Sequence, residues 1–385
     1  MMKHFILLTL LVTTSIPAYV AASGGIEGTG EISEPLKVVR IQAEDLVIDN
    51  YVNKSVKELL GQLNAVEYPF TLSIKGNAKV LHIEMLPKLR NLRGLEITWS
   101  MIAADLLPFI ATIYDLARVL PLMPLLEELR LSEYTLTYQN VADILPQMKN
   151  LRVLSTLNGE SGKILAPILP RTQNLQDLTY REIPFFERIL EFAPTLPKIR
   201  ELQALTLYLV SLNKWKADEL FSILQTVLKL TSLNLSFIEQ RGCELERMVD
   251  LAITLPTKLQ HLQALGITFY NREGSNWGSE RIEVLISLYQ RMPNLTTVRL
   301  EDKVLLESEL TALVTRAFQN MPNLRELSLR GSIHDLNNIE EVRVLIPLFQ
   351  KITHLTVLKL GSIDKPLDAT IAAELRGALF GVTVT

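Results

Sequence analysis

A short string of apolar positions recurs along most of the chain, in the order apolar-x-x-apolar-x-apolar, often with Pro or Asn just before it. Clear copies are MPNLTTVRL (Met292–Leu300) and MPNLRELSL (Met321–Leu329), and MPLLEELRL (Met123–Leu131) matches them closely. Alternation at the end of the string is typical of a short strand whose apolar side chains share one face. The first apolar position recurs at somewhat irregular intervals, at Leu92, Leu126, Leu151, Leu175, Leu202, Leu230, Leu262, Leu295, Leu324 and Leu355.

The stretches between these strings have the period of a helix. Residues 217–228 carry one apolar stripe, and residues 309–318 repeat the pattern. Each repeat is therefore predicted to form a strand, a turn, a helix and a loop that leads to the next strand. About six buried aliphatic side chains per unit contribute ~12 kcal/mol, whereas ordering the backbone costs ~1 kcal/mol or more for each residue. A lone unit of about 29 residues would stay unfolded, so the sequence predicts one stacked array rather than separate globular domains.

The recurring string resembles leucine-rich repeats, and the unit length and the helix of residues 217–228 look most like the ribonuclease-inhibitor-like subclass. The resemblance implies an α/β solenoid, a horseshoe with parallel strands on its concave face and helices on its convex face. The Asn or Cys that the family places after the strand is missing, because Ser332 and Ile363 stand there in two copies. Unit length also varies, so we expect an irregular horseshoe.

The N-terminus has the layout of a secretion signal: a short positive start, an apolar run from Phe5 to Val12, and small residues before Ser23. A buried helix or an uncleaved anchor is the alternative. The predicted divisions are a signal peptide (1–22), a flexible linker (23–35), N-terminal capping and degenerate repeats (36–91), leucine-rich repeats (92–366) and a C-terminal capping half-repeat (367–385). We expect a secreted or periplasmic protein that no segment holds in a membrane after signal cleavage.

Composition and motifs give little support to enzyme chemistry. The formal charge of −3 argues against a nucleic-acid partner, and the single Cys excludes a disulfide scaffold. The five His show no metal-ligand spacing, so neither a metal nor a cofactor is expected. Cys243 is an ordinary thiol in this interpretation, with a Cys-dependent hydrolase or ligase as the weaker alternative. Sequons at Asn53, Asn234 and Asn294 matter only if the source glycosylates secreted proteins.

The variable strand positions form the predicted binding face, because the strands line the concave side. Small neutral residues occupy the middle of this face, from Ala204 to Gly266, and charged residues flank them on both sides. The predicted partner-binding residues on the face are Glu128, Arg130, Asp177, Tyr208, Asn234, Arg299, Glu301, Glu326 and Arg330, with Glu96, Arg181 and Lys359 at equivalent positions. Ordinary solvent-facing positions are the alternative interpretation.

A longer insertion, FYNREGSNWGSE (Phe269–Glu280), holds aromatic and Arg residues among Gly, Ser and Asn. Such residues are favoured as interface anchors. We assign Tyr270, Arg272 and Trp277 to partner binding, although Phe269 and Trp277 could instead cover the core. The sequence as a whole predicts a monomeric, non-catalytic, exported scaffold that binds another protein, a step that relies on analogy from fold to function. A bacterial virulence or host-interaction factor is the alternative.

Overall fold

The computed structural model describes residues 37–42, 63–64, 68–76, 83–99, 116–131, 142–156, 164–181, 189–209, 214–238, 244–270, 279–301, 307–329, 339–360 and 367–384. The chain forms two compact units, of which the first ends at Asp177 and the second begins at Leu178. Strand order in the sheet is the order of the strands along the chain.

The first unit is a parallel ladder, and the described parts of its outer segments include short 3-10 helices. Leu72, Leu95, Leu129 and Leu154 are partners in register across four neighbouring strands, and all four side chains are buried. The strands are β1 (Lys37–Gln42), β2 (Phe70–Gly76), β3 (Leu92–Trp99), β4 (Glu128–Leu131) and β5 (Val153–Thr156), followed by β6 (Asp177–Arg181), in which the unit boundary falls. The 3-10 helices are η3 (Ile83–Lys88), η5 (Leu120–Leu122), η7 (Leu145–Gln147) and η8 (Leu169–Arg171).

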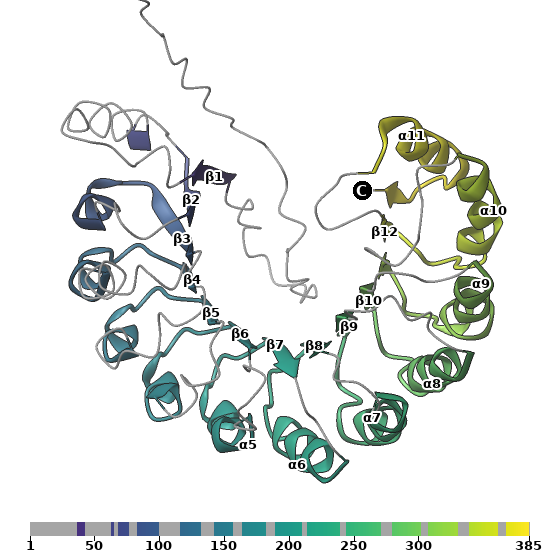
Figure 1. Cartoon of the computed structure of the whole chain (residues 1–385), viewed down its shortest axis with the longest axis horizontal. Coiled ribbons are helices and arrows are strands. Elements are labelled where there is room, and N and C mark those ends of the chain that lie inside the picture. The colour runs from purple at the N-terminus through teal and green to yellow at the C-terminus, as the bar shows by residue number, and fades with distance from the viewer. Residues whose placement is uncertain are drawn as a thin grey trace, which may run out of the picture. The chain divides into compact units, whose positions relative to one another are not determined.

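The second unit continues the strand pattern but carries longer helices. In Figure 1 its strands lie along the inner side, and helices α6 to α11 lie along the outer side. The strands are β7 (Ala204–Leu209), β8 (Ser232–Ile238), β9 (Ala264–Tyr270), β10 (Thr297–Glu301), β11 (Glu326–Ser328), β12 (Val357–Lys359) and β13 (Thr383–Val384). The helices are α5 (Ile189–Phe192), η9 (Ala193–Lys198), α6 (Lys214–Leu224), α7 (Glu244–Lys258), α8 (Ser279–Gln290), α9 (Glu307–Arg316), η10 (Phe318–Asn320), α10 (Ile339–Gln350) and α11 (Ala369–Ala378).

The core of the second unit lies between its strands and its helices. One apolar row crosses the sheet in register and is almost completely buried: Leu205, Leu233, Leu265, Val298, Leu327 and Leu358. Helix residues such as Leu220, Leu285 and Leu313 are buried as well. Because each repeat supplies only one apolar face, burial of that face requires the neighbouring repeats.

The two stripes predicted to be helical both lie in the second unit, and both overlap helices there. The stripe at 309–318 corresponds to α9 with η10. The stripe at 217–228 overlaps α6, but the helix ends at Leu224 and Leu228 is exposed, so the end of that prediction is wrong. In the first unit the outer turns end in 3-10 helices of the form Leu-Pro-x, at Leu120, Leu145 and Leu169. Proline suits the first helical turn and is disfavoured inside a longer helix, because it has no N–H and its ring crowds the preceding turn. In these repeats the described outer segments therefore end in a 3-10 helix, and α-helical residues 116–119 directly precede η5.

Asparagine stabilises the turn before the strand in both units. The amide Nδ2 of Asn150 donates to the Pro124 carbonyl at 2.7 Å, and Asn174 Nδ2 donates to the Lys149 carbonyl at 2.6 Å. Asn323 makes the equivalent bond to Pro293 at 3.2 Å. Each bond links one repeat to the previous one. The backbone support that we found missing after the strand is thus provided before it.

Candidate functional site

The residues that alternate with the core leucines point to the side of the sheet away from the helices, which we call the strand face. In the second unit a polar row runs across this face in register. We call it the central row, and it consists of Thr206, Asn234, Gly266, Arg299, Ser328 and Lys359. Six different strands each position one member, so the spacing within the row is set by the ladder.

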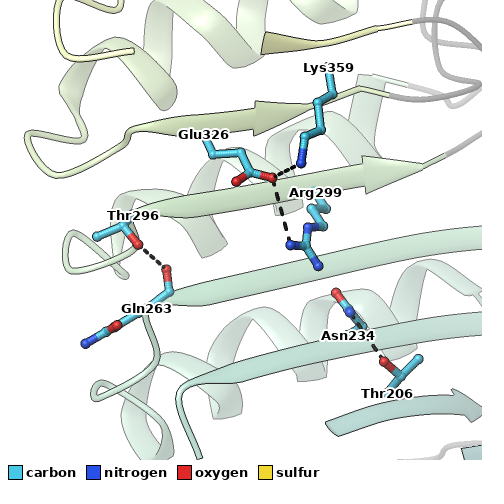
Figure 2. A network of polar contacts seen from close by, with 7 residues as sticks. All are labelled: Thr206, Asn234, Gln263, Thr296, Arg299, Glu326 and Lys359. Atoms are coloured by element: carbon cyan, nitrogen blue, oxygen red, sulfur yellow. Dashed lines mark hydrogen bonds and ion pairs between the residues drawn. The ribbon is translucent and has the colours of Figure 1, made fainter. Parts of the chain in front are cut away.

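An ion cluster occupies one end of the central row. Glu326, from the neighbouring row, accepts a hydrogen bond from Lys359 Nζ at 2.8 Å through its Oε1 atom. The same oxygen lies 3.8 Å from Arg299 Nη2. Figure 2 shows the carboxylate between the two cations. The exposed fractions of the side chains are 10% for Arg299 and 14% for both Glu326 and Lys359, so all three charges are largely removed from water.

The other end of the central row is neutral. Asn234 Nδ2 donates to Thr206 Oγ1 at 3.3 Å. A Cβ atom at Gly266 would overlap Asn234 Oδ1, so the absence of a side chain at Gly266 lets the carboxamide lie over β9. Among the described residues no donor reaches this Oδ1 atom, which faces toward the Arg299 end of the row in Figure 2. The row therefore offers an acceptor at one end and cations at the other.

The first unit presents a smaller charged group on its strand face. Glu96 and Arg130 are partners in register, and Arg130 Nη2 lies 3.5 Å from Glu128 Oε2 within β4. Gly94 of this unit leaves room for the side chain of Thr71, because a Cβ atom at Gly94 would overlap that side chain. Thr71 is buried and Glu96 is half-buried.

The structure describes most of the predicted binding residues, and their role in binding stays a prediction. Asp177 begins β6, and Tyr208 and Glu301 occupy strand-face positions on β7 and β10. Thr268 donates to Glu301 Oε2 at 3.4 Å. Tyr270 ends β9, and its side chain lies outside the described part of the structure. The predicted residues Arg330, Arg272 and Trp277 lie outside the described residues, as do Cys243 and Asn53.

Sequence reasoning identified the members of the ion cluster but not their pairing. Arg299, Glu326 and Lys359 belong to three successive repeats, and only the register of β10, β11 and β12 brings them together. The contacts of Gly94 with Thr71 and of Gly266 with Asn234 were missed as well. A glycine inside a strand is the signal that indicates such a close approach.

The described part of the chain offers no group of three or more His, Cys, Asp or Glu that could hold a metal ion. Within the same ranges, no helix has both the length and the apolar character needed to cross a membrane. Of the sequon residues, Asn234 is half-buried on the strand face and Asn294 is exposed in the turn before β10. Asn294 Nδ2 donates to the Gln260 carbonyl at 3.3 Å.

No protein-family model and no curated protein matches this sequence. Among solved structures, the chain is similar to a structural-genomics protein from Bacteroides fragilis, with 14% identity, coverage of 87% of this chain and 82% of that one, and a TM-score of 0.32. It is also similar to TLR13 in a complex with single-stranded RNA, with 14% identity and a TM-score of 0.24. That match covers 76% of this chain and 57% of the TLR13 chain.

The repeated apolar string and the parallel strand ladder define the fold class. The protein is an α/β leucine-rich-repeat solenoid, with one strand and one outer helical segment in each typical repeat. Folds of this kind generally act as scaffolds for interaction, so the chemistry of the strand face is the basis for any statement about function.

Proposed function

We propose that this protein is a non-catalytic, exported recognition scaffold, similar to the ribonuclease-inhibitor-like subclass, that binds a protein partner through its strand face and adjacent loops. The central row is the observation that supports this most directly. Over six consecutive strands of one ladder, it places hydroxyl, carboxamide, guanidinium and ammonium groups on five strands and a glycine on the sixth. Preorganised polar groups fix the register of a partner at little cost in conformational entropy.

Two variants that add the same charge on opposite sides of the sheet test this proposal. Thr206→Lys changes the strand face, whereas Leu228→Lys changes an outer turn in which the leucine is 93% exposed. Cross-linking to candidate partner extracts, read by mass spectrometry, should place the partner on strand-face peptides. Thr206→Lys should abolish those cross-links, and Leu228→Lys should leave them unchanged. Loss of cross-links in the Leu228 variant alone would contradict the proposal.

Export has its own test. The sequence predicts cleavage before Ser23, so the intact mass of the protein recovered outside the producing cytoplasm should correspond to a chain that begins at Ser23. Recovery of the full-length chain from the cytoplasm alone would contradict export while leaving the binding proposal standing.

A further inference from the structure

The turns that lead into the strands of the second unit lie at one edge of its sheet, because parallel strands all begin at the same edge. We call this edge the turn edge. Backbone hydrogen bonds join consecutive turns along it: the N–H of Thr296 donates to the Gln263 carbonyl, and the N–H of Arg325 donates to the Thr296 carbonyl, both at 2.8 Å. The turns therefore form a continuous row with the spacing of the strands. The turn edge consists of residues 198–203, 226–231, 258–263, 291–296, 320–325, 351–356 and 377–382, all of which the structure describes.

The turn edge is strongly positive although the chain as a whole is not. It holds seven Lys or Arg residues and one acidic residue, Glu201, which gives a formal charge of +6. The whole chain has a formal charge of −3, so the remaining residues together carry −9. Each of the first six segments of the edge contributes a net charge of +1. The cations are Lys198, Arg200, Lys229, Lys258, Arg291, Arg325 and Lys351.

Little of this positive charge is neutralised within the described part of the chain. Lys229 forms an ion pair with Glu201 at 2.6 Å, whereas Arg291 and Arg325 donate to backbone carbonyls, which carry no net charge. The other four cations make no side-chain contact with any described residue, and three of these four are exposed. Lys258 lies in the last turn of α7, where a cation also offsets the helix dipole, but that effect extends over only one turn. The edge therefore presents a row of cations to the solvent.

The most exposed apolar side chains lie on the same edge. Phe380 is 100% exposed and Leu228 is 93% exposed, the highest values among the large apolar side chains that the structure describes. They belong to the turns before β13 and β8, so the cations of four repeats lie between them. The turns of the first unit, taken by themselves, also expose Leu122 and Leu125, by 62% and 46%. A single exposed leucine is common, but apolar side chains that flank a row of cations are typical of a surface that contacts a lipid bilayer.

We propose that the turn edge of the second unit binds the surface of a lipid bilayer that contains anionic phospholipids. Its cations lie among the lipid phosphates, and Leu228 and Phe380 enter the boundary between the headgroups and the acyl chains. The contact is peripheral, so it needs no membrane-spanning helix, and within the described residues there is none. A single-stranded nucleic acid would also use the cations, but an exposed leucine offers it no surface for base stacking. The inference goes beyond the proposed function, because the strand face is a different side of the sheet and stays free.

Vesicle co-sedimentation with the full chain tests the cations. Affinity for vesicles of phosphatidylglycerol and phosphatidylcholine, mixed about 3:7 to give an anionic surface, should exceed affinity for phosphatidylcholine vesicles. The double variant Lys258→Gln/Lys351→Gln should lose affinity for the mixed vesicles about tenfold or more, because each cation at an anionic surface contributes about fivefold. The matched control is Lys214→Gln/Lys216→Gln. It removes the same charge in the first turn of α6, at the opposite edge of the sheet, and should leave the affinity unchanged.

The apolar side chains are tested in the same vesicles. Leu228→Ser and Phe380→Ser should each weaken binding about tenfold or more, because an apolar side chain no longer leaves water on binding. Val344→Ser is the matched control, since Val344 is 50% exposed on α10 and lies outside the turn edge. All of these variants should keep the melting temperature of the wild type, because the replaced side chains are exposed. They also share one N-terminal apolar run, whose contribution cancels in each comparison.

Three outcomes would overturn the inference. The first is equal affinity of the wild type for the two kinds of vesicle. The second is an equal loss of affinity in Lys258→Gln/Lys351→Gln and Lys214→Gln/Lys216→Gln. The third is a dependence on the cations with no effect of Leu228→Ser or Phe380→Ser, and tighter binding of a polyuridine oligonucleotide than of vesicles would then assign the edge to a nucleic acid. None of these outcomes bears on the strand face, which Thr206→Lys tests separately.

Discussion

The two units share the parallel strand ladder, but the described ends of their outer segments differ. In the first unit the described outer segments end in three-residue 3-10 helices that contain Pro121, Pro146 and Pro170. In the second unit α6 to α11 are 10 to 15 residues long. The in-register leucines of the strands are buried in both. The strand leucines are therefore buried both where the outer segment ends in a 3-10 helix and where it is a longer α-helix.

Short repeats and 3-10 helices coincide only in part, because η5 lies in the long repeat that begins at Leu92. The repeats that begin at Leu126 and Leu151 are the shortest, and they contain η7 and η8, whereas every repeat between Leu202 and Leu355 is longer. Proline favours the short helix, because its fixed φ suits a first turn.

The largest effect should come from the shared ladder and be similar in both units. Leu154→Ala in β5 and Leu233→Ala in β8 each remove a fully buried side chain, and each should lower the free energy of unfolding by about 2–5 kcal/mol. Urea denaturation followed by circular dichroism measures both. Leu228→Ala, at an exposed position, is the control and should change stability by less than about 0.5 kcal/mol. A negligible effect of Leu154→Ala alone would limit the ladder to the second unit.

The next effect on stability concerns a hydrogen bond between Arg291 and helix α7 of the second unit. Pro256 lies inside α7 and has no N–H, so the Ala252 carbonyl lacks its helical donor. Arg291 Nη1 donates to that carbonyl at 3.0 Å, and Ala252 is buried. Arg291→Met should therefore cost about 1.5–3 kcal/mol, because a buried acceptor loses a charged donor.

A double-mutant cycle isolates this contact. In a Pro256→Ala background the helix can supply its own N–H to Ala252, so Arg291→Met should cost less there than in the wild type. Equal costs in the two backgrounds, measured by urea denaturation, would mean that Arg291 stabilises the protein in another way.

Gly94 in the first unit and Gly266 in the second should differ in how much stability is lost when each is replaced by alanine. A Cβ atom at Gly94 would overlap three atoms of the Thr71 side chain, which is buried and β-branched, so Gly94→Ala should cost about 1–3 kcal/mol. At Gly266 the overlap involves only the end of the half-buried Asn234 side chain, which can rotate away. Gly266→Ala should therefore be milder in thermal unfolding. Gly377→Ala is the control, because nothing lies near its new methyl group.

The smallest effect concerns a helix cap that the described 3-10 helices of the first unit lack. Asp368 accepts hydrogen bonds from the N–H groups of Thr370 at 2.8 Å and Ile371 at 3.3 Å, and these bonds lower its pKa below the ordinary value of 3.8. The stabilisation is complete above the ordinary pKa and is lost as the pH falls through the lower, folded-state pKa. Amide exchange at Ile371 should accelerate over that acidic range, and Asp368→Asn should remove the dependence. The described cap positions of η5, η7 and η8 carry no side-chain cap.

Most of the ladder could be predicted from the sequence, because its signal is local and repeated. The alternation around Leu327 and Leu329 is visible within a single copy of the string, and the stripes of α6 and α9 lie within one helix each. The 3-10 helices were missed because the Leu-Pro pairs were treated as part of the spacing between strings. They recur at Leu120, Leu145, Leu169 and Leu196, which was a readable signal.

The candidate site was harder to predict, because its geometry depends on register between distant segments. Arg299 and Glu326 were each assigned to the binding face, but the sequence does not say which cation Glu326 contacts. The Asn turns had a local signal, an Asn directly before the leading leucine at Leu151, Leu175 and Leu324. Their acceptors lie one repeat away, so the bonds themselves required the structure.

Hydrogen exchange with mass spectrometry under native conditions tests the comparison most directly. The account predicts strong protection of strand amides in both units, including Leu129, Leu154, Leu233 and Leu265. It also predicts much weaker protection of the 3-10 segments Leu145–Gln147 and Leu169–Arg171 than of helices α6 and α9. Two results would contradict the account: unprotected strand amides in either unit, or 3-10 segments protected as strongly as helices α6 and α9.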